Sequence, residues 1–397
     1  MYTLRDWFFK YIALTSNEPL AFYVSRAEEE YIFDENNKPY LDCISGISVS
    51  NIGHSRKEII EAIKQQADKY LHTMVYGEHI QNPQVLLAKK LIELTNNYYN
   101  RVYFVNSGAE AVELAIKLCR RFTQRKQIIA CKKAYHGSTT GAMSLMSDDS
   151  YKAAYGTFIN DVEFIEFNNI ADVDRISNKT AGVFIEIIQG EAGYIPINKE
   201  FYNAIYEKCK QVGCLLIVDE IQTGIGRTGK FFAYQHFDKY PDIILLAKAL
   251  GGGLPLGAIL TKEEIANVIK EAPSLGHLTT FGGNPLSCAA SLAAIKYIEE
   301  NNLIENVNYK EKLFFENLNI NNFIKIRGKG LLLALELQNS DLVKKIIRYC
   351  FEKGILLDWF LFNDKAIRIA PPLTIKREQI LFVCETIKEG LRLNKIF

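Results

Sequence analysis

The chain has 397 residues, of which 48% are hydrophobic and 23% are charged, and its formal net charge is +1. This length exceeds one typical core and suits two domains, and the composition is that of an ordinary globular protein. A net charge so close to zero argues against a nucleic-acid partner or a membrane-surface partner. No run of about 18 apolar residues occurs, so no membrane span is expected.

The cysteine pattern bears on the compartment. The eight cysteines are scattered without a CxxC pair, and several stand in apolar runs. Cysteines of this kind usually act as small, buried hydrophobic side chains and stay reduced, so we expect a cytoplasmic protein. We also predict no metal site. The stretch 1–14 contains Arg5, Asp6 and Lys10 and lacks a small-residue cleavage site, so it is not predicted to be a signal peptide.

The N-terminal quarter predicts one hairpin and three helices. Residues 4–14 carry apolar side chains on one helical face, which suits a short helix docked on a domain or on a second subunit. Residues 28–51 alternate between apolar and polar, with a turn at 36–39, and are predicted to form a hairpin. Two more helices are predicted at 56–70 and 86–94.

The middle of the chain alternates strands with helices. Apolar runs of strand length occur at 101–105, 127–131, 182–188, 214–219 and 243–246, and helices are predicted at 106–121 and 199–212. Strands that alternate with helices indicate a mostly parallel sheet with crossover connections, and therefore an α/β fold. A long helix is predicted at 285–301, and the part beyond residue 307 reads as a small α+β domain.

A lysine follows the apolar run 243–246. Lys248 stands three positions before the glycines 251–253, and an unpaired ammonium in such a place is costly to desolvate. Burial lowers the pKa of a lysine and makes its amine a nucleophile toward a carbonyl. The alternative is an ordinary lysine that extends out of a strand end beside a glycine loop.

A second strand ends in an acid. The run 214–219 is apolar up to Asp219, as expected for a parallel strand buried on both faces. Ligands bind beyond the carboxyl ends of such strands, so Asp219 and Lys248 are predicted to face one crevice. A lysine for a Schiff base and a carboxylate for a ring nitrogen are what pyridoxal phosphate requires. The alternative for Asp219 is a helix N-cap.

A phosphate site is predicted after the strand 101–105. The segment 106–110 reads NSGAE and opens a helix, and free N–H groups together with the helix dipole favour an anion there. The alternative is a simple helix cap, with Ser107 as the cap and Glu110 at capping-box spacing.

The motifs DEIQTGIGRTG and AKALGGGLPLGA resemble those of the class-III pyridoxal-phosphate aminotransferases, closest to the acetylornithine and ornithine aminotransferase branch. The resemblance runs from about residue 31 to about residue 373. It implies a type-I pyridoxal-phosphate fold, with a large domain (56–300) and a small domain built from both chain ends (1–55 and 301–397). It also implies a homodimer with active sites at the interface.

The resemblance implies a role for each cofactor residue. Lys248 forms the Schiff base and moves the proton, and Asp219 holds the proton on the ring nitrogen. The remaining assignments are phosphate contacts from the loop at Ser107, Gly108 and Ala109, ring stacking by Tyr135, a contact under the ring by Ile221, the ring hydroxyl by Gln222, and the partner subunit's phosphate by Thr280.

The resemblance also implies substrate residues. Arg368 matches the arginine that binds an α-carboxylate, and Glu191 matches the glutamate that pairs with this arginine when an ω-amino substrate binds. The expected reaction moves an amino group from an ω-amino acid to 2-oxoglutarate and gives glutamate. Ser138 stands where the acetylornithine and ornithine enzymes usually have an arginine, which leaves 4-aminobutyrate, lysine, diamine or β-amino donors open.

Two other readings compete with transamination. An aminomutase on the same fold would need no separate acceptor. A binding protein could keep the fold without chemistry, but the presence of both Lys248 and Asp219 argues against it.

Overall fold

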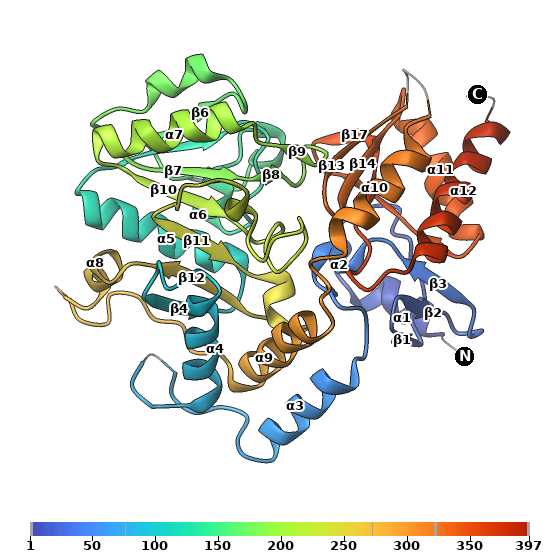
Figure 1. Cartoon of the computed structure of the whole chain (residues 1–397), viewed down its shortest axis with the longest axis horizontal. Coiled ribbons are helices and arrows are strands. Elements are labelled where there is room, and N and C mark those ends of the chain that lie inside the picture. The colour runs from blue at the N-terminus through green and yellow to red at the C-terminus, as the bar shows by residue number, and fades with distance from the viewer. Residues whose placement is uncertain (1–2, 76, 272, 321–323, 395–397) are drawn as a thin grey trace.

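The structure is a computed structural model, and it describes residues 3–75, 77–271, 273–320 and 324–394. Two parts lie side by side (Figure 1): a large part around one broad sheet, and a smaller part that contains both ends of the chain. None of the described helices is both long and apolar enough to cross a bilayer.

The large part is organised by a seven-stranded sheet. Its strands, in spatial order, are β4 (Arg101–Val105), β12 (Gly257–Thr261), β11 (Ile243–Leu246), β10 (Leu215–Asp219), β7 (Thr180–Glu186), β5 (Gln127–Cys131) and β6 (Val162–Ile165). Strand β12 is antiparallel to both of its neighbours, and the other six run in one direction. The predicted, mostly parallel sheet is therefore confirmed, although β6 and β12 were not predicted.

Both faces of this sheet are buried, which explains why its central strands are apolar throughout. Along β10, Leu215 and Ile217 pack on the side of helix α5 (Gly108–Thr123). Leu216 and Val218 point to the opposite side, in the same cluster as buried residues of helix α7 (Lys199–Val212). Alternate side chains thus enter two different cores, as expected for a strand with helices on both faces.

Three helices pack together at one end of the large part. Helix α9 (Pro285–Glu300) lies against α3 (Lys57–Ala67) and α4 (Asn82–Glu93). All three were predicted, but α4 begins four residues earlier than expected. Its first turn contains Pro83, which is compatible with a helix start because the first N–H groups have no partner inside the helix. Shorter helices in the large part are α6 (Thr140–Ser144) and α8 (Glu263–Ala266).

The smaller part joins the two ends of the chain. Strands β2 (Tyr31–Phe33) and β3 (Pro39–Asp42) form an antiparallel hairpin around the predicted turn, but the predicted hairpin was too long, because residues after Asp42 are not in a strand. Strand β1 (Arg26–Glu28) adds a third antiparallel strand, and β3 also pairs in parallel with β15 (Ile355–Leu356). A second sheet has the order β13 (Lys325–Lys329), β14 (Leu332–Glu336), β17 (Asn363–Ile369) and β16 (Asp358–Phe360). Its helices include α2 (Ser45–Ser48), α10 (Val307–Leu318), α11 (Ser340–Glu352) and α12 (Arg377–Leu393). The domain boundaries at 55/56 and 300/301 stay a prediction.

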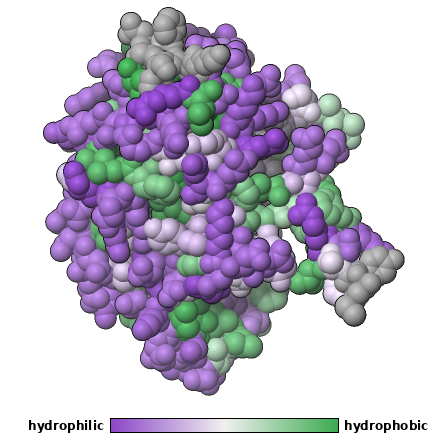
Figure 2. All heavy atoms as spheres, turned by 90° about the vertical axis from the view of Figure 1, so that its right-hand side faces the viewer, coloured by the Kyte–Doolittle hydropathy of each residue, from purple (hydrophilic) through white to green (hydrophobic). Residues whose placement is uncertain are grey.

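The surface of the smaller part differs from one place to another. The face seen in Figure 2 is mostly hydrophilic, with separate hydrophobic patches.

Helix α1 (Leu4–Tyr11) is shorter than predicted, and none of its residues is buried. Thr3 and Asp6 form a capping box at its start, while Trp7 and Tyr11 are exposed. Docking of this helix on a second subunit stays a prediction.

Candidate active site

The two strands that carry the predicted lysine and acid are neighbours. Strands β10 and β11 pair in parallel, with Asp219 opposite Leu245, so both end at the same edge of the sheet. Asp219 is the last residue of β10, and Lys248 follows the end of β11 by two positions. Both side chains line one cavity of about 460 Å³. The prediction that they face a common crevice is confirmed.

Lys248 is held in an unusual backbone conformation. It opens a short 3₁₀ turn, and its φ of 50° lies in the left-handed region that non-glycine residues rarely adopt. Strain of this kind concentrates at functional sites. Burial lowers the pKa of the Lys248 amine, and the charges of Glu191 and Asp219 only partly oppose this shift. The side chain is therefore closer to its nucleophilic, neutral form than an ordinary lysine.

Asp219 is paired with a buried histidine. Its Oδ2 lies 2.7 Å from Nδ1 of His136, and its Oδ1 accepts a hydrogen bond of 2.9 Å from the Ile221 backbone N–H. Burial lowers the pKa of His136, but the hydrogen bond and charge of Asp219 outweigh burial and raise it overall. The carboxylate thus both ends the strand with a short turn and faces the cavity. No pairing for His136 was predicted from the sequence.

A third acid, Glu186, also lines the cavity. It ends β7, and its carboxylate accepts hydrogen bonds from the backbone N–H groups of Tyr135 (3.3 Å) and Gly190 (2.9 Å). Burial raises its pKa to about 7, against the opposing effect of His136. This residue was missed from the sequence, where the only signal was an acid inside an apolar strand.

The start of helix α5 forms one wall of the cavity. Ser107 caps the helix by accepting a bond of 3.2 Å from the Glu110 N–H. The return bond of the predicted capping box is different, because the Glu110 carboxylate accepts from Asn106 N–H (2.8 Å) rather than from Ser107. Ser107, Gly108 and Ala109 all line the cavity, so this helix start is both capped and open to an anion.

The opposite wall approaches this helix start closely. A Cβ added to Gly108 would lie 2.7 Å from Cδ1 of Ile221, so the backbone there leaves room for no side chain. Next to Ile221, the Oε1 atom of Gln222 is buried and has no hydrogen-bond partner among the described residues. The Tyr135 and Ser138 hydroxyl groups lie 3.0 Å apart, and both residues line the cavity.

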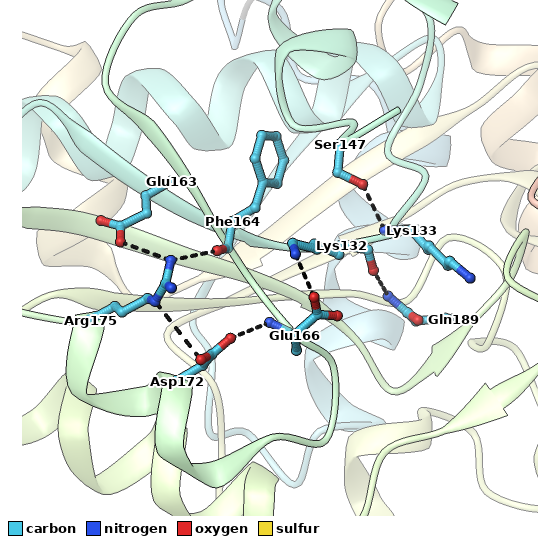
Figure 3. Close-up of polar contacts among 9 residues, drawn as sticks. All are labelled: Lys132, Lys133, Ser147, Glu163, Phe164, Glu166, Asp172, Arg175 and Gln189. Carbon is cyan, nitrogen blue, oxygen red and sulfur yellow. Dashed lines mark hydrogen bonds and ion pairs between the residues drawn. The ribbon is translucent and has the colours of Figure 1, made fainter. Parts of the chain in front are cut away.

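The loop after β5, which continues to Tyr135 and His136, begins with Lys132 and Lys133. Figure 3 shows that these two lysines are anchored on both sides. Gln189 donates a hydrogen bond of 2.7 Å to the Lys132 carbonyl, and the Lys133 N–H donates one of 3.0 Å to the Ser147 hydroxyl. The Lys132 side chain forms an ion pair with Glu166 at the end of β6. These bonds fix the loop after β5 and so help to place the ring and the histidine.

Glu191 and Arg368 form a buried ion pair. Nη2 of Arg368 lies 2.7 Å from Oε2 of Glu191, and their side chains are 2% and 6% exposed. The same carboxylate oxygen accepts a bond of 3.1 Å from Leu361 N–H, and Arg368 also donates to the Trp359 carbonyl at 3.1 Å. Burial lowers the pKa of Arg368, but the nearby Tyr194 and Glu191 outweigh burial and raise it overall. Arg368 is therefore a stable cation held beside the cavity.

Nine of the eleven predicted site residues line one cavity: Ser107, Gly108, Ala109, Tyr135, Glu191, Asp219, Ile221, Gln222 and Lys248. Arg368 lies next to it through Glu191. Thr280 is not part of this lining and is exposed on the surface of the single chain. A lysine, a buried acid and a helix start around one cavity fit a group with an aldehyde, a ring nitrogen and a phosphate.

Comparisons with known proteins agree with this fit. The family model of class-III aminotransferases matches residues 12–391. Acetylornithine aminotransferase of Archaeoglobus fulgidus is 39% identical over 90% of this chain and 92% of its own length. The LysW-aminoadipate semialdehyde/glutamate semialdehyde transaminase of Sulfolobus acidocaldarius is 37% identical over 93% of this chain and 94% of its own length.

Solved structures give the same result for the fold. Ornithine aminotransferase of Toxoplasma gondii, crystallised with partial occupancy of pyridoxal phosphate, superposes with a TM-score of 0.91 and 28% identity. The match covers 98% of this chain and 94% of that chain. The fold is thus the expected type-I fold of pyridoxal-phosphate enzymes. The chain belongs to the class-III aminotransferases, and pyridoxal phosphate is its cofactor.

Proposed function

We propose that this aminotransferase moves an amino group from an ω-amino acid to 2-oxoglutarate, with Lys248 and Asp219 as its central residues. The observation that carries the proposal is that Lys248 shares a cavity with the buried Asp219–His136 pair. The cofactor supplies the electron sink for the reaction. Lys248 provides the amine that binds the cofactor and then serves as acid and base at the reacting carbon.

The other residues bind and orient. Asp219, held by His136, places a negative charge where a ring nitrogen keeps its proton. Gly108 and Ala109 offer the start of helix α5 to a phosphate, and Ser107 caps that helix. We assign Tyr135 to the face of the ring, Ile221 to its other side and Gln222 to its hydroxyl.

To accept both substrates, Arg368 has to pair either with Glu191 or with a substrate carboxylate. With Arg368 paired to Glu191, the cavity suits a donor that presents its ω-amino group. When a substrate carboxylate displaces Glu191, Arg368 binds it, as a guanidinium does well. The names of the relatives favour an acetylornithine-type donor. Ser138, whose hydroxyl lies beside that of Tyr135, stands where that branch usually has an arginine. Other ω-amino donors therefore have to be compared with acetylornithine.

One experiment decides between these donors. The holoenzyme is mixed with acetylornithine, ornithine, 4-aminobutyrate, lysine or glutamate, and the absorbance of the cofactor is followed through a single half-reaction. We expect glutamate and at least one ω-amino donor to react rapidly. A protein that reacts with none of these amines would contradict the proposed function.

The proposal includes a homodimer in the cytoplasm. Large exposed apolar side chains occur in two segments, 71–86 and 275–281, which meet where the rings of His72 and Phe281 lie 5.0 Å apart. We define the interface patch as seven exposed apolar side chains of these segments: Leu71, Met74, Ile80, Val85, Leu275, Leu278 and Phe281. Ile80 and Val85 line a cavity together with Thr279 of the second segment. An exposed apolar area of this kind indicates an interaction site. A second copy of the chain is the proposed occupant, because Thr280 lies inside the patch and is assigned to the partner's cofactor.

The dimer can be tested directly. Ile80 is 92% exposed, so replacing it by glutamate should leave the fold of the subunit intact. Sedimentation should show a dimer for the parent protein and a larger monomer fraction for Ile80→Glu, with weaker retention of the cofactor. A fully active monomer of the parent protein would refute this part of the proposal.

A further inference from the structure

We propose that Asn106 and Thr279 are positioning residues that act across the dimer: their hydrogen bond joins the cofactor loop of each subunit to the segment it presents to its partner. The inference rests on the proposed function, which assigns Thr280 to the partner's phosphate. It adds a physical connection between the two cofactor sites and identifies the bond that forms it.

The segment 273–283 is held down by bonds within its own subunit. The Tyr103 hydroxyl donates to the His277 carbonyl at 2.8 Å, and the Gln84 side chain donates to the Gly283 carbonyl at 2.6 Å. Between these two points, Nδ2 of Asn106 donates to the Thr279 hydroxyl at 2.7 Å. The segment is therefore fixed in place before any partner binds.

The backbone of this segment lies directly on strand β4. A Cβ added to Gly282 would be 2.6 Å from the Phe104 carbonyl oxygen and 3.0 Å from Cα of Val105. Phe104 and Val105 are the last residues of β4, and Asn106 follows them at the cavity wall. A displacement of the cofactor loop is thus transmitted to the segment through close contact, and not only through the hydrogen bond.

The segment presents its side chains in two directions. Thr279 points inward to Asn106, whereas its neighbours Leu278 and Thr280 are exposed, as is Phe281. The exposed Leu278 and Phe281 belong to the interface patch. Since Thr280 is bonded directly to Thr279, fixing the hydroxyl of Thr279 also fixes the position from which Thr280 reaches the partner.

Asn106 also acts on its own cofactor site. Its Nδ2 donates both to Thr279 and to the Glu110 carboxylate, which lies 3.0 Å away, and its backbone N–H donates to the same carboxylate at 2.8 Å. Glu110 stands in the first turn of helix α5, beside Ser107. One amide therefore links the first turn of the phosphate-facing helix to Thr279, so that loss of the bond is expected to affect two sites, one in each subunit.

Mixed dimers separate the two effects. Subunits with different tags are co-produced and purified through both tags, and one subunit carries Lys248→Ala, so that only the other forms the covalent link whose absorbance reports cofactor binding. Thr279→Val is placed either in the reporting subunit or in its partner. We expect cofactor affinity at the reporting site to fall about 3- to 10-fold in both arrangements, the effect of one lost hydrogen bond. Thr279→Ser should restore it.

The controls make the result specific. Thr123 has a hydroxyl bond of 2.7 Å to the Cys119 carbonyl at the far end of α5, so Thr123→Val should change the affinity in neither arrangement. If Thr279→Val fails to fold, Thr279→Ala removes the same hydroxyl with less bulk. Unchanged affinity when the substitution is in the partner would overturn the inference, since the bond would then act only within its own subunit.

The same experiment distinguishes failure of this inference from failure of the proposed function. A parent protein without a cofactor absorbance that depends on Lys248 would refute the proposed chemistry. A parent protein that binds cofactor normally as a monomer would refute the dimer and this inference, but would leave the roles of Lys248 and Asp219 intact.

Discussion

Replacing Glu191 by alanine should convert a two-substrate site into one that favours glutamate. In the parent enzyme, glutamate must displace the Glu191 carboxylate from Arg368, which it holds at 2.7 Å. A hydrogen bond to a charged group contributes roughly 1.5–3 kcal/mol. Removing this competitor should raise kcat/KM for glutamate relative to the ω-amino donor by about 10- to 100-fold. Half-reaction kinetics with both substrates measure this ratio.

The Glu191→Ala substitution should also lower the stability of the fold. Arg368 is almost fully buried, and among the described residues the Trp359 carbonyl is the one hydrogen-bond acceptor that it keeps without Glu191, so the substitution should destabilise the fold by about 3–5 kcal/mol. The matched control is Glu336→Ala, which removes the acid of the more exposed pair with Arg327 on the same sheet. It should leave the substrate ratio unchanged. An unchanged ratio in Glu191→Ala itself would refute the switch and leave Glu191 as a structural acid.

Three further predictions concern Lys248 and its surroundings. Lys248→Ala should almost abolish turnover and remove the absorbance that depends on the covalent link, and normal steady-state transamination would contradict the assignment. Because burial lowers the pKa of Lys248, capture of the cofactor aldehyde by apoprotein should rise with pH with a midpoint below 10.5, and a midpoint at or above 10.5 would be inconsistent with a desolvated amine. His136→Ala should weaken cofactor binding because Asp219 loses its partner at 2.7 Å, whereas His136→Gln should restore part of the affinity. Equal cofactor titration curves for the parent and both variants would exclude a positioning role for His136.

The sequence predicts elements well where the pattern is local. Strands β4, β5 and β11 match their predicted bounds residue for residue, because each is a short apolar run with a polar or glycine-containing flank. Strand β12 was missed: it follows β11 through the loop 247–256, which contains the 3₁₀ turn of Lys248, and it reverses direction without a crossover α-helix. Its apolar run, Ala258–Leu260, is only three residues long and lies next to the glycine loop, so it was not assigned to a separate strand.

The candidate site was predictable only in part, because its contacts depend on strand order. Asp219 and Lys248 end neighbouring strands, and the buried runs before them were readable from the sequence. His136 follows β5, which is separated from β10 by β7, so its bond to Asp219 requires the spatial order of the sheet. The meeting of Glu191 with Arg368 was expected from family resemblance alone, since no local pattern connects two residues so far apart in the chain.

The pairing of β3 with β15 has a consequence for the order of events during synthesis. Leu41 donates its backbone N–H to the Gly354 carbonyl at 2.8 Å, so one edge of the N-terminal ribbon is completed only by residues near the other end of the chain. At about 5–20 residues per second, a ribosome needs roughly 15–60 s to make the intervening segment. Throughout that interval β3 is an uncovered strand edge, which is a template for pairing with other chains. The seven-stranded sheet of the large part is encoded before β15, so it can form while the edge of β3 is still uncovered.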